Sequence, residues 1–323
     1  MTTNISKMEQ QYLILSAILR DGLSSELFVK MKGVQGLESL SSAPVEYDED
    51  EALAAHFTTL NMEVMPCESL FLGRECMLGG EVTDSVISAY AQGGFSPSVD
   101  DISPDHIGVE LAYMGWLVGA ELEATDDKEP KIAARCVELQ RQFLDNHLLR
   151  WLGAMVASVE ETKDDTDHGI YYIYALRAAH KLAVDHLKLI SPRDLSTEGI
   201  WSLPETGELL TKENTGLREI AQFLVTPSHA GAFISRAHIQ ALGRAGNLPR
   251  GFGPRRQILT TLLRTGVDYS QIDEVVTGLT SLFGGWQAEL RKQDCAHNGP
   301  WIGRIEETMG ILGQMGSAIR EDV

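Results

Sequence analysis

The feature that most constrains the fold is a long segment with helical periodicity, residues 131–162. Apolar residues recur in it at steps of three or four positions, with a single step of five, which is close to the spacing of one face of an α-helix. These positions are Ile132, Cys136, Leu139, Phe143, Leu148, Trp151 and Met155. The alternation of apolar and polar residues that marks a half-buried strand is hard to find anywhere in the chain. The sequence therefore predicts an all-α helical bundle.

Other segments extend this pattern. Further helices are predicted at residues 8–19, 52–60, 83–92 and 169–190. A run of acidic residues precedes the second of these helices and is expected to form its solvated start: Glu46, Asp48, Glu49, Asp50 and Glu51. Residues 61–80 contain Pro66 and several glycines, which favour a long loop over a continuous helix.

Residues 103–111, with the sequence SPDHIGVEL, combine a predicted helix start with three titratable side chains. Ser103 is a favoured N-cap residue, and Pro104 suits the first helical position because its missing N–H would be unpaired there. Asp105 places negative charge at the positive end of the helix dipole. His106 and Glu110 are four positions apart and so share one helix face. We therefore expect polar chemistry at the border of the core.

Three motifs, which follow one another along the chain at residues 66–69, 103–111 and 143–151, resemble the TorD/DmsD (NarJ-like) family, cytoplasmic chaperones of molybdenum-cofactor reductases. SPDHIGVEL resembles the family's PDHxxxEL signature, and PCES at residues 66–69, followed by Val82, Val86 and Tyr90, resembles its PxES run. FLDNHLLRW at residues 143–151 is similar to its FxxxHLxxW helix. The resemblance covers about residues 1–190 and implies a TorD-like helical bundle. It also implies a system-specific chaperone that binds a molybdopterin-dependent oxidoreductase subunit during cofactor insertion, and its twin-arginine leader where that subunit is exported.

The resemblance implies that the client-binding region consists of the PxES loop and the PDH helix start. The expected client-binding residues are Pro66, Glu68, Ser69, Pro104, Asp105, His106 and Glu110. On this interpretation carboxylates receive arginines of the client, and Asp105 and His106 line a solvent-reachable groove beside residues 66–69. The alternative interpretation is architectural: Asp105 caps the helix, Glu110 bonds a neighbouring loop and His106 holds segments in register. Both interpretations stay open.

Charge and composition exclude several classes of protein. The 323 residues contain 27 Lys and Arg against 46 Asp and Glu, for a net charge of −19, which argues against a binder of nucleic acid or of anionic membranes. The 4 cysteines form no CxxC pair, so free thiols in a reducing compartment are expected. No apolar stretch approaches the ~20 residues of a membrane span, and residues 1–21 do not resemble a signal peptide. We therefore expect a soluble cytoplasmic protein.

The chain is expected to divide into a helical chaperone domain at residues 1–190, a linker or surface excursion at 191–216 and a helical C-terminal extension at 217–323. Residues 217–264 are distinctly basic, with seven arginines and a single acid, Glu219. A loop followed by a helix start there suggests a candidate anion site made of Arg250, Arg255 and Arg256. Alternatively, these arginines pair with the acidic first part of the chain.

Motifs for catalysis and cofactor binding are absent from the sequence. It contains no GxxxxGK[ST] loop, no HExxH, no ExxH pair and no GxSxG. We therefore expect no enzyme activity, cofactor or metal. The alternatives to a chaperone are a helical protein that binds an anionic ligand or cofactor through the basic segment, and a subunit-docking scaffold without a peptide groove. A monomer or a homodimer is expected, and the sequence does not identify the client.

Overall fold

A computed structural model describes residues 2–97, 102–160, 168–191, 201–206, 209, 215–249 and 251–321. Across these residues the regular secondary structure is helical, and strand-type pairing is limited to an isolated antiparallel bridge between Cys67 and His106. The predicted all-α fold is confirmed. None of the described helices is long and apolar enough to cross a membrane.

The chain forms two compact units. The first comprises Met1–Ser69 and Met77–Leu195, and the second comprises Leu70–Cys76 and Ser196–Val323. The chain thus contributes to the second unit twice, first with a short segment directly after the PCES motif and then with its C-terminal part. The sequence pattern did not assign this short segment to the C-terminal part. The linker predicted at residues 191–216 lies mostly outside the described residues.

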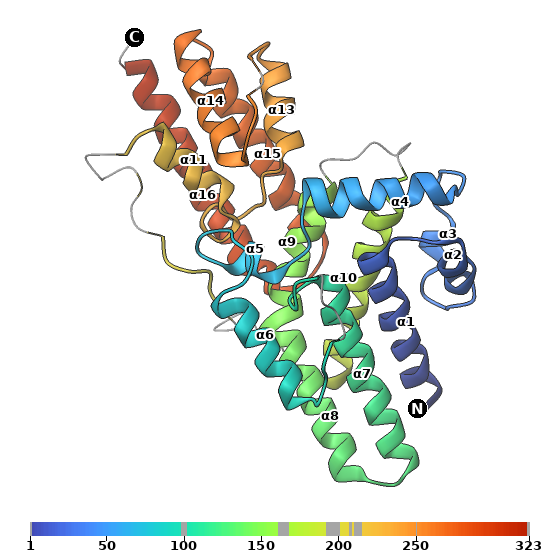
Figure 1. Cartoon of the computed structure of the whole chain (residues 1–323). Helices are drawn as coiled ribbons and strands as arrows, with labels where there is room; N and C mark the ends of the chain where they lie inside the picture. Colours follow the sequence, from blue (N-terminus) through green and yellow to red (C-terminus); the bar gives the residue numbers. More distant parts are fainter. Residues whose placement is uncertain are drawn as a thin grey trace. The chain divides into compact units, whose positions relative to one another are not determined.

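The first unit is built around two long helices, α1 and α7, which pack against each other along much of their length (Figure 1). α7 also packs on α8, and α10 packs on α1 and α9. Tyr12, Leu111 and Trp151 are fully buried in this core, and each large apolar side chain buried contributes ~1.5–3 kcal/mol. The helices are α1 (Thr2–Asp21), α2 (Ser25–Lys32), α3 (Glu38–Ser41), α4 (Glu49–Phe57), η1 (Thr58–Glu63), α6 (Glu81–Gln92), α7 (Ile107–Asp126), α8 (Pro130–Phe143), η2 (Leu144–Leu148), α9 (Leu149–Glu160) and α10 (Ile170–Ile190).

Most of the predicted helices are confirmed. Those at residues 8–19, 83–92 and 169–190 correspond to α1, α6 and α10. The helix predicted at 52–60 corresponds to α4 and the π-helix η1 that continues it. The loop predicted for residues 61–80 also contains a short helix, α5 (Glu68–Leu72), whose first two residues belong to the first unit and whose last three belong to the second.

The long helix predicted at residues 131–162 is observed as two α-helices joined without a break by a short π-helix. α8 passes at Leu144 into the π-helix η2, and α9 follows from Leu149 to Glu160. Residues 161 and 162 lie outside the described residues. The π-helix was not predicted because the apolar spacing on either side of it stays helical. Such π-turns occur frequently at functional sites.

The predicted start of the PDH helix is wrong. α7 begins at Ile107, and its N-cap is His106, whose Nδ1 accepts the amide hydrogen of Gly108 at 3.1 Å. Ser103 and Pro104 lie in the turn before the helix. The helix starts later because the backbone and carboxylate of Asp105 are bonded to residues 68 and 69, which holds this residue outside a helical turn.

The second unit has its own aromatic core. Trp286 and Trp301 are fully buried, and Phe71 from the short segment lies 5.4 Å from Phe233 and 6.5 Å from Trp301 between ring centroids. Aromatic pairs at such distances add to the stabilisation from burial alone. The helices of this unit are α11 (Leu217–Val225), α12 (Pro227–Ala230), α13 (Arg236–Ala245), α14 (Arg255–Asp268), α15 (Ile272–Lys292), the 3-10 helix η3 (Ala296–Asn298) and α16 (Gly299–Glu321).

Glycines allow α1 and α7 to approach closely. A Cβ atom at Gly108 would lie 2.6 Å from Arg20 Cβ and 3.0 Å from the backbone oxygen of Ser16. The hydroxyl of Ser16 donates a hydrogen bond to the carbonyl of Gly108 at 2.6 Å. One of the obstacles is backbone, so the contact cannot adjust by a side-chain rotation alone. The first turn of α7 is therefore fixed against α1 at this point.

Gly108→Ala is expected to lower the free energy of unfolding by ~1–3 kcal/mol, because the added methyl group overpacks the α1–α7 contact. Urea unfolding followed by circular dichroism measures this. Gly119→Ala in the same helix is the control, since its Cβ would meet only the flexible end of Glu9, 2.7 Å away. That variant is expected to be as stable as the wild type or more stable by up to ~1 kcal/mol. Equal stability of the Gly108 variant and the wild type would contradict the close packing.

Candidate functional site

Backbone hydrogen bonds join the PCES segment to the turn that precedes α7. The amide of Glu68 donates to the carbonyl of Asp105 at 2.9 Å, and the amide of Ile107 donates to the carbonyl of Pro66 at 2.8 Å. The isolated bridge described above lies between these two bonds. The two segments that the sequence motifs singled out therefore lie side by side, as expected.

Asp105 is fully buried and closes this junction with its side chain. Its Oδ2 accepts the amide hydrogen of Ser69 at 2.7 Å, and its Oδ1 accepts the hydroxyl hydrogen of Ser103. On the other side of the turn, the hydroxyl of Tyr90 donates to the carbonyl of Pro104 at 2.8 Å. A buried carboxylate needs such partners. Asp105 thus ties the turn to the first residues of α5 in the PCES segment and does not cap α7.

Glu110 lies one turn into α7 and is fully buried. Its Oε2 accepts the indole hydrogen of Trp151 at 3.2 Å, whereas its Oε1 meets no hydrogen-bond donor within the described part of the chain. Burial raises the pKa of Glu110 well above its usual value, and repulsion from the carboxylates of Glu68 and Asp105 raises it further. The raised pKa favours the protonated form of Glu110, in which the repulsion from Glu68 is removed.

Glu68 links this buried acid to His147. The imidazole Nδ1 of His147 lies 3.2 Å from both carboxylate oxygens of Glu68. Burial raises the pKa of Glu68, while the hydrogen bonds from His147 and Glu110 act in the opposite direction. The ring of Phe143 stacks on the imidazole with a centroid distance of 4.9 Å. The position of His147 is thus set by a chain of buried contacts that begins at Glu110.

His106 does not take part in an acid–imidazole pair. Its side chain is buried, and burial is the main cause that lowers its pKa to about 4, with the nearby His56 as a smaller cause. The imidazole is therefore neutral at pH 7. The prediction that Asp105 and His106 line a solvent-reachable groove is wrong, because both side chains are buried. Whether these residues serve client binding stays a prediction.

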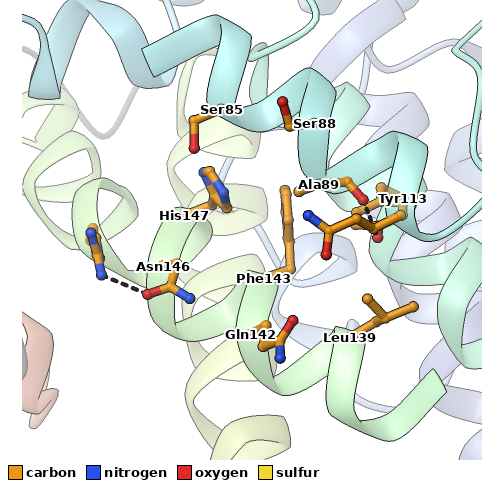
Figure 2. Close-up of a pocket in the computed structure, with 11 residues that line it drawn as sticks. Ser85, Ser88, Ala89, Tyr113, Leu139, Gln142, Phe143, Asn146 and His147 are labelled. Carbon is orange, nitrogen blue, oxygen red and sulfur yellow. Dashed lines mark hydrogen bonds between the residues drawn. The ribbon is translucent and has the colours of Figure 1, made fainter. Parts of the chain in front are cut away.

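An open groove does lie next to the buried cluster. It has a volume of about 340 Å³ and runs between α6 on one side and the α8–η2–α9 path on the other (Figure 2). In Figure 2, His147 and Phe143 point toward the face of α6 that carries Ser85, Ser88 and Ala89. The lining residues are Ser85, Ser88, Ala89, Gln92, Tyr113, Leu139, Gln142, Phe143, Asn146, His147 and Arg150.

His147 connects the groove to the buried cluster. It lines the groove and bonds Glu68 with the same side chain. Sequence reasoning did not propose His147 as a functional residue, since a histidine on a helix otherwise rich in leucine is usually a satisfied core residue. The FxxxHLxxW motif was the available signal, because it contains Phe143, His147 and Trp151 together. All three belong to the observed network.

The arginines of the candidate anion site have separate partners. Arg255 donates to the carbonyl of Ile234 at 2.7 Å and to Cys76 Sγ at 2.9 Å, and it stacks over the ring of Phe233. Arg256 donates to the side chain of Gln222 at 3.2 Å. Arg250, the third predicted member, lies outside the described residues. The described residues also include no cluster of three or more histidine, cysteine or acidic side chains that could hold a metal ion.

Comparison with known proteins agrees with the motifs. Residues 32–157 match the family model of the nitrate reductase delta subunit, which represents chaperones of redox enzyme maturation. The matched segment contains the PCES run, the PDH turn and the His147 helix, and it spans less than half of the chain. It confirms the resemblance to the redox enzyme maturation chaperones. No curated protein and no solved structure matches the chain.

Glu110→Gln is expected to flatten the pH dependence of stability. Because its pKa is raised by folding, Glu110 holds its proton to a higher pH in the folded protein than in the unfolded chain, where it ionises near pH 4.5. The folded state therefore binds more protons above that pH, and the free energy of unfolding falls as the pH rises toward the raised pKa. One such group contributes a slope of at most ~1.4 kcal/mol per pH unit. Glutamine cannot ionise, yet its amide can still donate to Glu68 and its oxygen can still accept from Trp151.

Urea unfolding of the wild type and of Glu110→Gln at several pH values between about 5 and 8 measures how the free energy of unfolding of each protein changes with pH. Glu123→Gln, an exchange at the other end of α7, is the control and is expected to keep the wild-type slope. Identical slopes for the wild type and the Glu110 variant would show that Glu110 is ionised in the folded protein.

Proposed function

We propose that this protein is a dedicated chaperone of a molybdopterin-dependent oxidoreductase. It holds a subunit of that enzyme in the cytoplasm while the cofactor is inserted and, where this subunit carries one, binds its twin-arginine leader. The observation that carries the proposal is the family match over residues 32–157. The three motifs within this stretch supply the buried cluster and the groove that lies next to it. Members of this family are chaperones, so binding of the client is the activity that we assign, and no catalysed reaction.

The chemistry of the groove supports a polypeptide ligand. Its polar lining consists largely of hydroxyl and amide groups, including those of Ser88, Gln92, Gln142 and Asn146, and none of the lining residues is acidic. Neutral side chains of this kind can both donate and accept hydrogen bonds, as the backbone of a bound segment requires at every residue. The rings of Phe143 and Tyr113 add apolar surface. A client segment would therefore bind through its backbone and an apolar side chain.

The motif residues would act in client binding by shaping this groove. The carboxylate of Glu68 holds His147, protonated Glu110 holds Glu68, and Asp105 fixes the backbone from which Glu68 projects. Pro66, Ser69, Pro104 and His106 belong to the same junction through their backbone or side-chain hydrogen bonds. This places the carboxylates behind the contact surface. A client arginine would meet them only after the junction opens.

Ser88→Trp tests the groove. Ser88 is an exposed residue of α6 on the groove wall, and an indole there would fill the space between α6 and η2. We expect the amount of molybdoenzyme subunit that co-purifies from the native host to fall at least about tenfold, which corresponds to ~1.4 kcal/mol. Ala91→Trp is the matched control, because Ala91 is exposed on the same helix outside the groove. Thermal melts of both variants monitor the fold.

Two results would contradict the proposal in different ways. Undiminished capture of the client by Ser88→Trp would show that the groove is not the binding surface. Absence of any molybdoenzyme subunit among the proteins that co-purify with the wild type would reject the chaperone function itself.

A further inference from the structure

The second unit carries a basic surface in a chain that is strongly acidic, with a net charge of −19. Helices α11, α13 and α14 contain no lysine, and their acids are Glu219, which bonds the amide of Gly216, and Asp268. Their arginines form no ion pair with an acid among the described residues, whereas arginines elsewhere, such as Arg141 and Arg304, do so. The arginines of these three helices are Arg218, Arg236, Arg244, Arg255, Arg256 and Arg264, and all but Arg255 are exposed.

Three of these arginines share one surface on α11 and α14, which pack against each other. Arg256 donates to the side chain of Gln222 at 3.2 Å. Arg218 lies one turn before Gln222 on the same face of α11. Arg264 follows Arg256 by about two turns on the exposed side of α14. We call Arg218, Arg256 and Arg264 the arginine face.

Apolar side chains lie beside the arginine face. Phe252, in the loop between α13 and α14, is 90% exposed, and Val267 is 50% exposed. Val267 follows Arg256 by about three turns, which returns it to the same side of α14. A Cβ atom at Gly251 would lie 3.5 Å from the Cβ atom of Thr261, so the loop that carries Phe252 runs alongside α14. The surface therefore combines unpaired arginines with exposed apolar groups.

The backbone directly after Phe252 is restricted. Gly253 has a φ of +119°, a conformation that favours glycine, and Pro254 has a φ of −60° at the N-cap of α14. A restricted loop loses less conformational freedom when a partner binds, which favours affinity. The ring of Phe252 contributes almost no burial to the fold. Its exposure is therefore better explained by a partner than by the packing of the second unit.

We propose that this surface binds an acidic segment of a partner protein, in which carboxylates stand among apolar side chains. The carboxylates pair with the arginine face, because a guanidinium group can bind a carboxylate through two parallel hydrogen bonds. The apolar side chains of the segment cover Phe252 and Val267. Charge complementarity selects this occupant, since a basic segment would be repelled by the unpaired arginines.

Two observations favour a protein over other anionic partners. Arginine and aromatic residues are enriched in protein interfaces and lysine is depleted there, which matches the composition of α11, α13 and α14 and of the loop with Phe252. A nucleic acid or an anionic membrane is an extended polyanion, which a chain with a net charge of −19 repels.

The inference goes beyond the proposed function. α11 and α14 lie outside residues 32–157, the part of the chain that matches the family model. The groove beside α6 is lined by residues of the first unit alone. Binding of an acidic segment therefore does not depend on the assignment of the groove to the client.

The test uses a fluorescein-labelled synthetic peptide in which pairs of glutamates alternate with single leucines. Its binding to the full-length chain is followed by fluorescence anisotropy. Arg256→Glu combined with Arg264→Glu should weaken binding at least about tenfold at low ionic strength. This difference should shrink as salt is added, because salt screens the charges of an exposed site. Lys131→Glu combined with Arg135→Glu is the matched control, since both residues are exposed on α8 and the net charge changes by the same amount. It should bind the peptide like the wild type.

Phe252→Ser tests the apolar part of the surface. We expect it to weaken binding of the peptide at least about tenfold, because the leucines lose the ring that they cover. A peptide with serines in place of the leucines should bind the wild type more weakly than the leucine peptide does. This difference should disappear in Phe252→Ser, since the two changes remove the same contact.

Ile132→Ser is the control for the apolar change, since Ile132 is 54% exposed on α8. Thermal melts monitor the fold of each variant. No binding of the leucine peptide by the wild type, undiminished binding by the Phe252 or arginine variants, or an equal loss in the α8 variants would each overturn the inference. It would also be overturned if vesicles of phosphatidylglycerol or double-stranded DNA bound the wild type more tightly than the peptide and required Arg256 and Arg264.

Discussion

Two carboxyl groups buried side by side dominate the structure of the first unit. Glu68 and Glu110 cannot both be ionised in a fully buried site, because each would raise the free energy of the other. A proton on Glu110 removes this repulsion. The indole of Trp151 and the imidazole of His147 take up the remaining oxygens. Removing any one partner would leave a buried group unsatisfied, so the cluster holds its segments as a unit.

This cluster explains why widely separated motifs belong to one site. The PCES segment supplies Glu68, α7 supplies Glu110, and the η2–α9 path supplies His147 and Trp151. The only member that reaches the surface is His147, which lines the groove beside α6. In this account the buried acids give the groove its shape, and the neutral amides and hydroxyls of its walls provide the contacts to a client.

The fold class could be predicted from sequence because helical periodicity depends only on which residues are apolar. That residues 66–69 and Asp105 lie side by side was expected because both segments belong to the family resemblance. The start of α7 could not be predicted from sequence. The hydrogen bond that holds Asp105 outside the helix comes from Ser69, 36 positions earlier in the chain. The burial of the His106 side chain was also missed. The π-helix at residues 144–148 coincides with the single five-residue step in the apolar spacing, from Phe143 to Leu148, but this step alone does not predict a change of helix type. The motif that contained His147 was the only clue to the role of that residue.

The protonation state of Glu110 is the claim on which the account depends most directly. Infrared spectroscopy of the protein labelled with carbon-13 at the glutamate side-chain carboxyl group can detect a protonated carboxyl at pH 7 by its C=O stretch, which is separate from the carboxylate bands. We predict such a band in the wild type at pH 7 and its loss in Glu110→Gln, while Glu123→Gln retains it. A wild-type spectrum with carboxylate bands alone would contradict the account, because Glu68 and Glu110 would then both be ionised.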